Sequence, residues 1–298
     1  MANLKVAHIN LTKFKSHASE EKPDLLAVEE PLEIRIVYGE EYHRKEINLS
    51  VTMRTPGNDF ELALGFLFSE GVIRDFHDII SIHYCQSVKK PEELGNVLKV
   101  EIKAQSTFDI SSLERNFYTN SACGVCGKSS IDKVLDKKNI SYTLPNIQVN
   151  PQILVELPKK LSQEQSVFAH TGGLHASALF PTSGDLFLIR EDIGRHNALD
   201  KVIGACLHEK LIPLSEYILL LSGRISYELV QKAIMAGIQV IAAVGAPSSL
   251  AVSLAKESSI TLIGFLREHS FNVYTGKERV LEYKTTDSQF FNQVELNQ

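Results

Sequence analysis

The sequence is poor in cysteine, in long apolar stretches and in basic clusters. Of its four cysteines, Cys85 and Cys206 are isolated, while Cys123 and Cys126 form a C-x-x-C pair. This is unlike the disulfide framework of a secreted domain. No stretch of about 18 uncharged apolar residues is present, so we expect no membrane-spanning helix. Residues 1–15 lack the apolar core of a signal peptide. We therefore expect a cytoplasmic protein that does not bind a membrane.

The charge balance disfavours a nucleic-acid partner. Lys and Arg number 31 against 36 Asp and Glu, which gives a net charge of -5, and no basic run is long enough to follow a phosphate backbone. The chain has 298 residues, of which 44% are hydrophobic and 22% charged. These values are typical of a soluble globular protein with one large or two modest domains.

The first part of the chain has the patterns of a small α+β unit. Apolar and polar residues alternate with a period of two in several short segments, which predicts half-buried strands. Asn58 follows a Pro-Gly turn, and we expect it to cap a helix in a capping box with Glu61; that helix should end at Gly71. The predicted strands are residues 32–38, 46–53, 79–84 and 97–103.

From Asn150 onward, apolar segments alternate with helical patterns. Asn150 and Pro151 form the cap and first turn of a helix that Pro158 should kink or break. Nearly continuous apolar strands between helices predict a covered, largely parallel sheet. We expect strands at 217–221, 239–244 and 260–265, and helices at 197–209, 226–236 and 248–257. The predicted fold class is α/β, with an α+β N-terminal domain over residues 1–147 and a C-terminal sheet domain over residues 148–298.

The cysteine pair is the strongest candidate for chemistry. It follows a polar segment, residues 105–122, of the kind that forms surface loops. A cysteine reacts as its thiolate, and Lys128 together with a predicted helix start at Ser129 would lower the thiol pKa. The pattern alone leaves sulfur transfer, redox chemistry and metal binding open. A zinc site would need two more ligands, and His170 and His175 lie too far along the chain for a zinc finger.

Three further segments carry glycines and polar residues where strands are predicted to end. An open α/β sheet binds ligands at the carboxyl ends of its strands, and the helix starts that follow favour phosphate. The alternative is that the serines at 248 and 249 only cap a helix and that the arginines are surface charges. The candidate ligand contacts are Ser222, Gly223, Arg224, Gly245, Ala246, Pro247, Phe265, Leu266, Arg267, Glu268, His269 and Ser270.

Two histidine-containing segments add candidates for the same site. His175 follows the paired glycines of residues 171–174, and an imidazole exchanges protons near neutral pH. The alternative is a hydrogen-bonded core histidine. Arg195 and His196 stand in the charged segment 190–197, which would equally suit a structural network of ion pairs.

Together these segments resemble the FdhD family of formate dehydrogenase accessory sulfurtransferases. No single motif decides this, but the order and combination of the segments are specific and they span most of the chain. The segments that carry the resemblance are residues 53–57, 61–67, 123–128, 171–176, 191–201, 222–224, 246–249 and 272–274.

The resemblance implies a sulfur relay. The protein would accept sulfur from a cysteine desulfurase as a persulfide on Cys123, with Cys126 beside it. It would deliver the sulfur to the molybdenum of a bis(molybdopterin guanine dinucleotide) cofactor, because formate dehydrogenase requires that sulfido ligand. The resemblance also implies a homodimer and a three-layer C-terminal domain like that of cytidine deaminases. Because the sequence has one cysteine pair and the nearest His pair is remote from it, we expect no tightly held metal. Deaminase chemistry is not expected, since Ala176 and Ser177 follow His175 and no Pro-Cys pair exists.

A second hypothesis belongs to another class of function. The chain would be a non-catalytic molybdenum-cofactor chaperone whose cysteine pair binds a metal. The sequence leaves open which desulfurase donates the sulfur, whether formate dehydrogenase is the only acceptor, and what Cys126 does.

Overall fold

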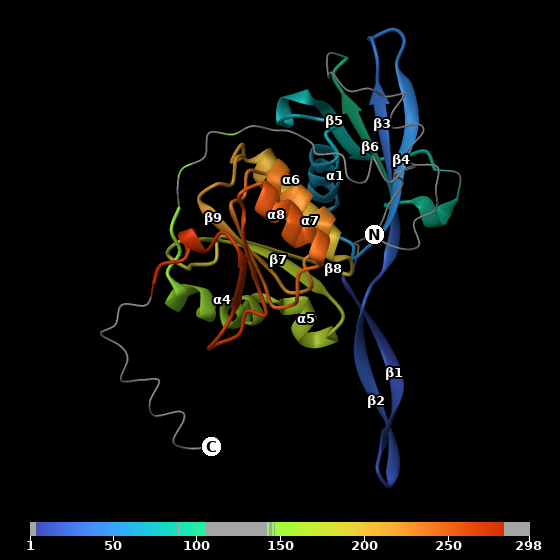
Figure 1. Cartoon of the computed structure of the whole chain (residues 1–298). Coiled ribbons are helices and arrows are strands. Elements are labelled where there is room, and N and C mark those ends of the chain that lie inside the picture. The colour runs from blue at the N-terminus through green and yellow to red at the C-terminus, as the bar shows by residue number, and fades with distance from the viewer. Residues whose placement is uncertain (1–3, 89, 105–141, 143–144, 146, 283–298) are drawn as a thin grey trace, which may run out of the picture.

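Three sheets organise the chain. The computed structural model describes residues 4–88, 90–104, 142, 145 and 147–282. These residues form a two-stranded arm, a four-stranded sheet and a six-stranded sheet (Figure 1). No helix within these ranges is long and apolar enough to cross a membrane.

The four-stranded sheet is built from the alternating segments. In its central strand Leu32, Ile34 and Ile36 are buried, while the residues between them are partly exposed. This is the period of a strand with one covered face. The strand order is β4-β3-β6-β5, and all four predicted strands are confirmed. They are β3 (Glu30–Tyr38), β4 (Lys45–Arg54), β5 (Ile79–Tyr84) and β6 (Val97–Ile102).

The first helix, α1 (Asp59–Ser69), begins where predicted but without the predicted cap. Asn58 adopts a left-handed conformation with φ 59°, and its side chain accepts no capping bond. Glu61 forms an ion pair with the six-stranded sheet instead. The first turn is held by buried Asp59, whose Oδ2 lies 2.9 Å from Nη2 of Arg54. The capping-box prediction is wrong, because tertiary contacts rather than local ones fix this helix start.

The six-stranded sheet mixes parallel and antiparallel strands in the order β12-β11-β10-β9-β7-β8. The three middle strands β9, β10 and β11 run parallel, as their apolar sequences predict. The outer strands β8 and β12 each follow their neighbour after a short connection, and a short connection forces antiparallel pairing. The strands are β7 (His175–Pro181), β8 (Leu188–Asp192), β9 (Tyr217–Leu221), β10 (Val240–Ala243), β11 (Thr261–Gly264) and β12 (Asn272–Thr275).

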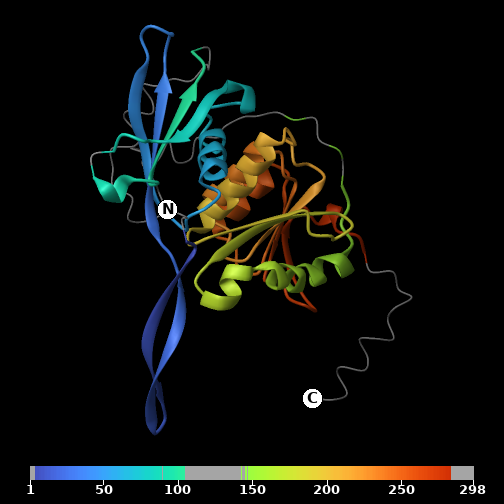
Figure 2. The ribbon, with the colours of Figure 1, turned by 180° about the vertical axis from the view of Figure 1, so that it is seen from behind.

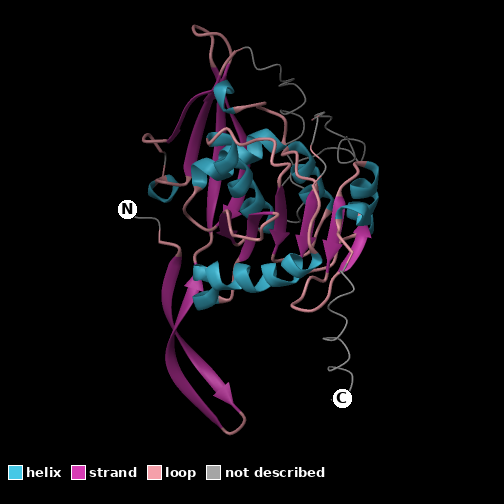
Figure 3. Cartoon of the chain, turned by 90° about the vertical axis from the view of Figure 1, so that its left-hand side faces the viewer, coloured by secondary structure: helices cyan, strands magenta, loops and turns pink. Residues whose placement is uncertain are grey.

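Helices cover both faces of this sheet and complete three layers (Figures 1 and 3). Along β9, Leu219 and Leu221 belong to one apolar core, whereas Ile218 and Leu220 belong to the core on the other face. The first core includes α6, α7 and α8, and the second includes α4. The predicted α/β class is confirmed. The helices are α4 (Pro151–Glu164), α5 (Ser166–Thr171), α6 (Arg195–His208), α7 (Tyr227–Met235) and α8 (Ser249–Glu257).

Helix α4 starts as predicted and continues further. The Asn150 side chain accepts from Gln152 N–H at 2.9 Å, and a proline occupies the first turn. Pro158 does not break the helix. Leu154 and Leu157 before it and Leu161 after it are buried against the sheet, so packing offsets the hydrogen bond that the proline cannot make.

Helices α1 and α6 touch through two glycines. A Cβ on Gly65 would overlap the backbone carbonyl of Asp200, and one on Gly204 would overlap that of Glu61. The backbones therefore approach closer than side chains would allow. A single apolar core runs from β3 across this contact to α8. The two predicted units share that core, and the boundary at residues 147 and 148 stays a prediction.

Three buried ion pairs stand beside the same contact. Each joins a lysine or arginine that is at most 7% exposed to an aspartate that is at most 2% exposed. The closest distances are 2.9 Å for Arg54–Asp59, 2.7 Å for Lys201–Asp192 and 2.8 Å for Lys232–Asp200. We call these six residues the buried ion-pair cluster.

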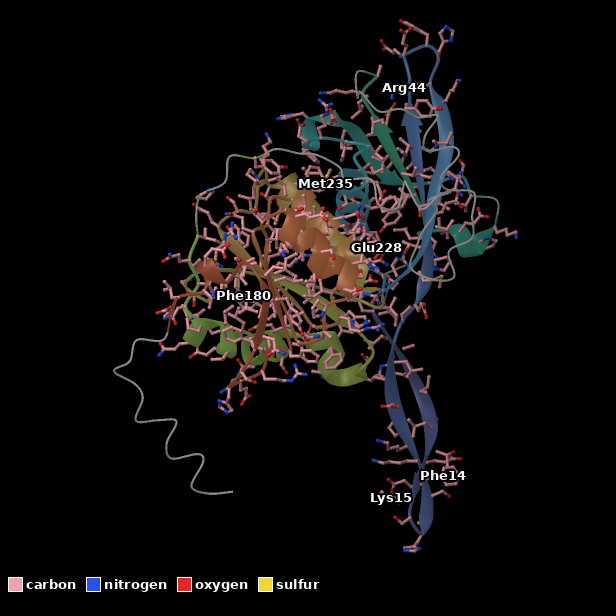
Figure 4. The ribbon with its side chains drawn as sticks, in the orientation of Figure 1. Phe14, Lys15, Arg44, Phe180, Glu228 and Met235 are labelled. Atoms are coloured by element: carbon pink, nitrogen blue, oxygen red, sulfur yellow. The ribbon has the colours of Figure 1, made fainter. Side chains whose placement is uncertain are left out.

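The two-stranded arm was not predicted. It consists of β1 (Val6–Lys15) and β2 (Ala18–Ala27), which pair antiparallel over ten residues each. The arm extends away from the body of the molecule (Figures 1 and 2), and Phe14 and Lys15 lie near its tip (Figure 4). Apolar and polar residues alternate only over residues 7–12 of β1, and most of β2 is polar, so the pattern of a half-buried strand covers only part of the arm.

Candidate functional site

The carboxyl ends of β9, β10 and β11 meet along one edge of the six-stranded sheet. The Gly245 N–H donates to the Gly223 carbonyl at 3.2 Å, and the Phe265 N–H donates to the Gly245 carbonyl at 3.1 Å. The Ile225 N–H donates to the Ala246 carbonyl at 3.0 Å. Three segments that are separate in the sequence therefore form one surface. We call residues 222–226, 244–248 and 265–270 the strand-end ledge.

Two glycines allow the ledge to close up. A Cβ on Gly245 would lie 2.7 Å from the carbonyl oxygen of Gly223, a distance that side chains do not tolerate. A Cβ on Gly223 would lie 3.1 Å from Nδ1 of His175. A larger residue at position 245 would push the β9 and β10 loops apart. His175 lies directly against the ledge.

His175 is held between the ledge and β8. It opens β7 opposite Asp192. The next residue, Ala176, exchanges two hydrogen bonds with Ser222: its N–H donates to Oγ at 2.8 Å, and its carbonyl accepts from the Ser222 N–H at 3.0 Å. Burial of the ring and the nearby positive charge of Arg195 lower the pKa of His175 below its ordinary value. At neutral pH the imidazole is therefore uncharged, with one donor and one acceptor nitrogen.

Arg195 and His196 form the first turn of α6 and lie near His175. The Nε of Arg195 is buried and has no hydrogen-bond partner among the described residues. His196 Nε2 lies 3.0 Å from Ser226 Oγ and 3.6 Å from Glu228 Oε2. This contact lowers the pKa of Glu228 to about 2, so its carboxylate stays charged. Figure 4 shows Glu228 on α7.

The helix starts behind the ledge already have partners from the chain itself. The charged Glu228 lies in the first turn of α7, where it interacts favourably with the positive end of the helix dipole. Ser248 caps α8, because its Oγ accepts from the Ala251 N–H at 3.2 Å, which confirms the alternative that the sequence left open for this serine. The charged side chains exposed at the ledge are those of Arg224, Arg267 and Glu268.

The loop after β11 forms one wall of a cavity of about 590 Å³. Arg267 Nη1 donates to the carbonyls of Val244, at 2.6 Å, and Leu266, at 3.0 Å. The Arg267 N–H donates to the Ser270 carbonyl at 2.8 Å. Arg267 therefore holds the loop in place as well as placing a positive charge at the cavity. All five predicted residues from Leu266 to Ser270 line this cavity.

The opposite wall was missed by sequence reasoning. It is formed by α4, and its polar residues are Lys159, Ser162 and Gln163. Their spacing of three and four residues places them on one face of a helix. That face is visible in the sequence, but nothing local indicates that it turns towards a loop about a hundred residues further along the chain.

The predicted charged segment proves to be mainly structural. Arg190 pairs with Glu61, at 2.5 Å between Nε and Oε2. Glu191 accepts backbone N–H groups at the start of α5, and Asp192 belongs to the buried ion-pair cluster. The ion-pair alternative is therefore confirmed for Arg190 and Asp192, whereas Arg195 and His196 lie beside His175.

The cysteine pair and the predicted helix after it lie outside the described residues. The cysteines within the described part, Cys85 and Cys206, are both buried. Burial raises the pKa of the Cys206 thiol to about 12, so it stays protonated and unreactive at neutral pH. Among the described residues no group of three or more His, Cys, Asp and Glu side chains could hold a metal ion.

Comparisons with known proteins agree on one family. A family model described as the FdhD/NarQ family matches residues 27–281. "Sulfur carrier protein FdhD" of Streptomyces coelicolor is 49% identical over 271 residues, covering 90% of this chain and 93% of the relative. The protein of the same name from Sulfurisphaera tokodaii is 43% identical, covering 93% of this chain and all of the relative.

A solved structure has the same fold. It is that of a proposed formate dehydrogenase accessory protein from Desulfotalea psychrophila, with a TM-score of 0.68 and 22% sequence identity. The match covers 93% of this chain and 100% of the other. With a family model spanning both cysteines and the whole ledge, the chain belongs to the FdhD/NarQ family.

Proposed function

We propose that this protein is a sulfur carrier in the maturation of formate dehydrogenase. The observation that carries the proposal is the family match over residues 27–281, together with relatives at 43–49% identity that are named sulfur carriers. The matched range includes Cys123 and Cys126. Of the four cysteines these two remain as carriers, because Cys85 and Cys206 are buried.

The carrying step is a thiol exchange. The Cys123 thiolate attacks the outer sulfur of the persulfide on a cysteine desulfurase. The S–S bond of the donor breaks, the donor's cysteine leaves as a thiolate, and Cys123 becomes a persulfide. Delivery breaks the new S–S bond and leaves Cys123 as a thiolate. The acceptor metal supplies the two electrons that convert the transferred sulfur atom to a sulfido ligand.

The acceptor we propose is the molybdenum of bis(molybdopterin guanine dinucleotide), bound at the strand-end ledge. This group carries diphosphates and guanine bases, and the ledge offers the cations of Arg224 and Arg267. Beside the neighbouring His175 lies Arg195, whose buried Nε has no hydrogen-bond partner among the described residues. The cavity of about 590 Å³ lies within the range of roughly 300–1,000 Å³ for small-molecule sites. Phe265, with 44% of its surface exposed, offers a ring for stacking on a base. The donor set therefore fits the group.

Within this site His175 orients the ligand and adds no charge. Its neutral ring donates one hydrogen bond and accepts another, and it lies where the β7 and β9 segments meet. The positive charges come from arginines, whose charge does not change near neutral pH. Binding of an anionic ligand should therefore change little between pH 6 and 8 if arginines carry it.

The activity of the acceptor enzyme tests this proposal. Formate dehydrogenase should stay inactive when its maturation depends on a Cys123→Ala variant, and should mature with the wild-type chain. Cys126→Ala is the matched variant, and the size of its defect defines what the second thiol does. Retention of full formate dehydrogenase activity with both cysteines replaced would exclude the sulfur relay and favour a cofactor chaperone.

A further inference from the structure

The start of α6 carries a cation that has no partner within the part of the chain that the structure describes. Arg195, the first residue of α6, is partly buried. Its Nε is buried, and no hydrogen bond or ion pair joins its guanidinium to another described residue. By contrast, each cation of the buried ion-pair cluster lies within 2.9 Å of an aspartate. A buried donor without an acceptor costs free energy, so Arg195 is placed to receive an acceptor from outside the chain.

The backbone of the same helical turn offers further donors. Helix α6 is 14 residues long, and no side chain caps its start. The first N–H of the turn that finds an acceptor is that of Ala198, which donates to the Gly194 carbonyl at 3.0 Å. The N–H groups of residues 195–197 precede it and make no hydrogen bond to another described residue. The first turn also holds no acidic residue. The positive end of the helix dipole and the guanidinium therefore act at one place.

Strand β7 brings two polar side chains to the side of the sheet that α6 covers. His175 and Ser177 are two residues apart on this strand, so they share a face. Leu179 continues that face and packs in the apolar core that includes α6. Ser177 is 1% exposed, and its Oγ has no hydrogen-bond partner among the described residues. Such a hydroxyl is an exception in native structures. It is a second, independent indication that this place takes a ligand.

The acidic side chains around this turn already have partners. Asp192 lies 2.7 Å from the Nζ of Lys201 and accepts the Gly194 N–H at 2.8 Å. Glu228 lies in the first turn of α7, 3.6 Å from the Nε2 of His196. Neither carboxylate pairs with the guanidinium at the start of α6, whose charge is therefore left uncompensated. We call His175, Ser177 and residues 195–197 the α6 niche.

The α6 niche continues the strand-end ledge at the end away from the cavity. His175 lies against Gly223 of the ledge. The strand order places β7 three strands from β11, which corresponds to about 14 Å at the usual spacing of strands. In each half of the proposed cofactor, the guanine and the metal stand at opposite ends with the diphosphate between them. A guanine held at the cavity therefore directs the metal end along the ledge towards the niche.

We propose that the α6 niche is an oxyanion subsite, separate from the diphosphate contacts, that binds the molybdenum end of the cofactor through its oxygen ligands. This inference rests on the proposed function, because it requires that the cofactor lies along the ledge. The guanidinium of Arg195 and the helix N–H groups donate to metal-bound oxygen. The neutral ring of His175 donates to an oxo group or accepts from a hydroxo group. Molybdate is a small ligand of this class that contains neither guanine nor diphosphate.

Calorimetric titration of the full-length chain with molybdate alone tests the niche without any readout of activity. The wild type should bind molybdate. Arg195→Gln removes the charge and should weaken binding about ten- to a hundredfold, the range for a lost hydrogen bond to a charged group. Arg74→Gln removes the same charge at an exposed position and should bind as the wild type does. Because Arg195 has no partner among the described residues, both variants should keep the unfolding midpoint of the wild type.

GDP separates this inference from the proposed function. GDP should bind to Arg195→Gln as it binds to the wild type, and saturating GDP should not displace molybdate. Absence of molybdate binding, its displacement by GDP, or equal weakening by Arg74→Gln would overturn the oxyanion subsite. GDP binding that persists in the same samples would leave the proposed function standing.

A variant of the buried hydroxyl tests how deep the subsite extends. Ser177→Ala deletes a group that makes no hydrogen bond to another described residue, so it should not lower the unfolding midpoint. It should nevertheless bind molybdate more weakly than the wild type. Binding that is unchanged in Ser177→Ala would overturn the assignment of Ser177 to the subsite.

Discussion

The buried ion-pair cluster and the strand-end ledge use the same kinds of side chain in opposite surroundings. In the cluster, Lys201 and Asp192 are 1% and 0% exposed and lie 2.7 Å apart. At the ledge, Arg224 and Arg267 are exposed, and Arg267 lines the cavity. A buried charge must be neutralised by a fixed partner, whereas an exposed one stays available to a ligand. Burial therefore separates the charges that hold the fold from those that can bind.

Removal of one residue of a buried ion pair should have the largest effect, and it should act on the stability of the fold. Lys201→Ala leaves the Asp192 carboxylate buried without its counter-charge, and we expect a loss of about 3–5 kcal/mol in the free energy of unfolding. Urea denaturation measures this loss. Lys256→Ala removes an exposed lysine at the end of α8 and should change stability by less than about 0.5 kcal/mol. Equal effects of the two variants would contradict the assignment of a structural role to the cluster.

Removal of a ledge charge should act on binding and not on stability. GDP contains the guanine base and the diphosphate of the proposed cofactor and serves as its probe. Arg224→Ala should weaken the binding of GDP by about 1–3 kcal/mol, the scale of a lost charge-assisted hydrogen bond. Calorimetric titration measures this affinity, and Lys256→Ala again serves as the control that loses the same charge elsewhere. GDP binding that is undiminished in Arg224→Ala, or absent from the wild type, would remove the ledge from the cofactor site.

Salt should weaken ligand binding at the strand-end ledge but should have little effect on the contribution of the buried ion-pair cluster to stability. Raising the ionic strength from about 0.1 M to 1 M shortens the screening length from about 10 Å to 3 Å. GDP affinity should fall severalfold, because exposed arginines carry it. The stability difference between the wild type and Lys201→Ala should change little, because water and ions do not reach the buried pair. A GDP affinity that is independent of salt would mean that apolar contacts dominate binding.

The smallest effect concerns pH. The pKa of His175 is lowered in the folded state, so between that value and the unfolded pKa of about 6.5 the unfolded chain binds more protons. Stability should therefore be full above pH 6.5 and decline as the pH falls through the folded pKa. His175→Gln should reduce this decline when urea denaturation is compared at pH 5 and pH 7.5. His208→Gln, at an exposed site, should leave the decline in stability unchanged. If the decline is also unchanged in His175→Gln, groups other than His175 cause it.

Local signals predicted much of the fold but little of how its parts meet. The apolar strand at 217–221 and the helix that starts at Asn150 were predictable because their patterns and caps are contained in a few neighbouring residues. The cap at Asn58 was wrong because Arg54 and Asp59 fix that turn through tertiary contacts. The arm was missed because the apolar period covers only residues 7–12 of β1 and does not continue in the mostly polar β2.

The candidate site was predictable only in part, for the same reason. Glycines and arginines after apolar strands indicated the ledge, since strand ends in an α/β sheet meet at one edge. Nothing local indicated that Lys159 and Gln163 of α4 form the facing wall. Equally, Arg190 resembled a site residue in the sequence, and only the folded chain brings it to Glu61.

The sulfur relay through Cys123 is tested most directly by the mass of the protein after incubation with a cysteine desulfurase and cysteine. We expect a gain of one sulfur atom, about 32 Da, that maps to Cys123 and disappears after reduction. Cys123→Ala should gain nothing, whereas Arg224→Ala should load as the wild type does because loading needs only the thiolate and its donor. Absence of the added sulfur from the wild-type chain, or its presence in Cys123→Ala, would contradict a sulfur relay through Cys123.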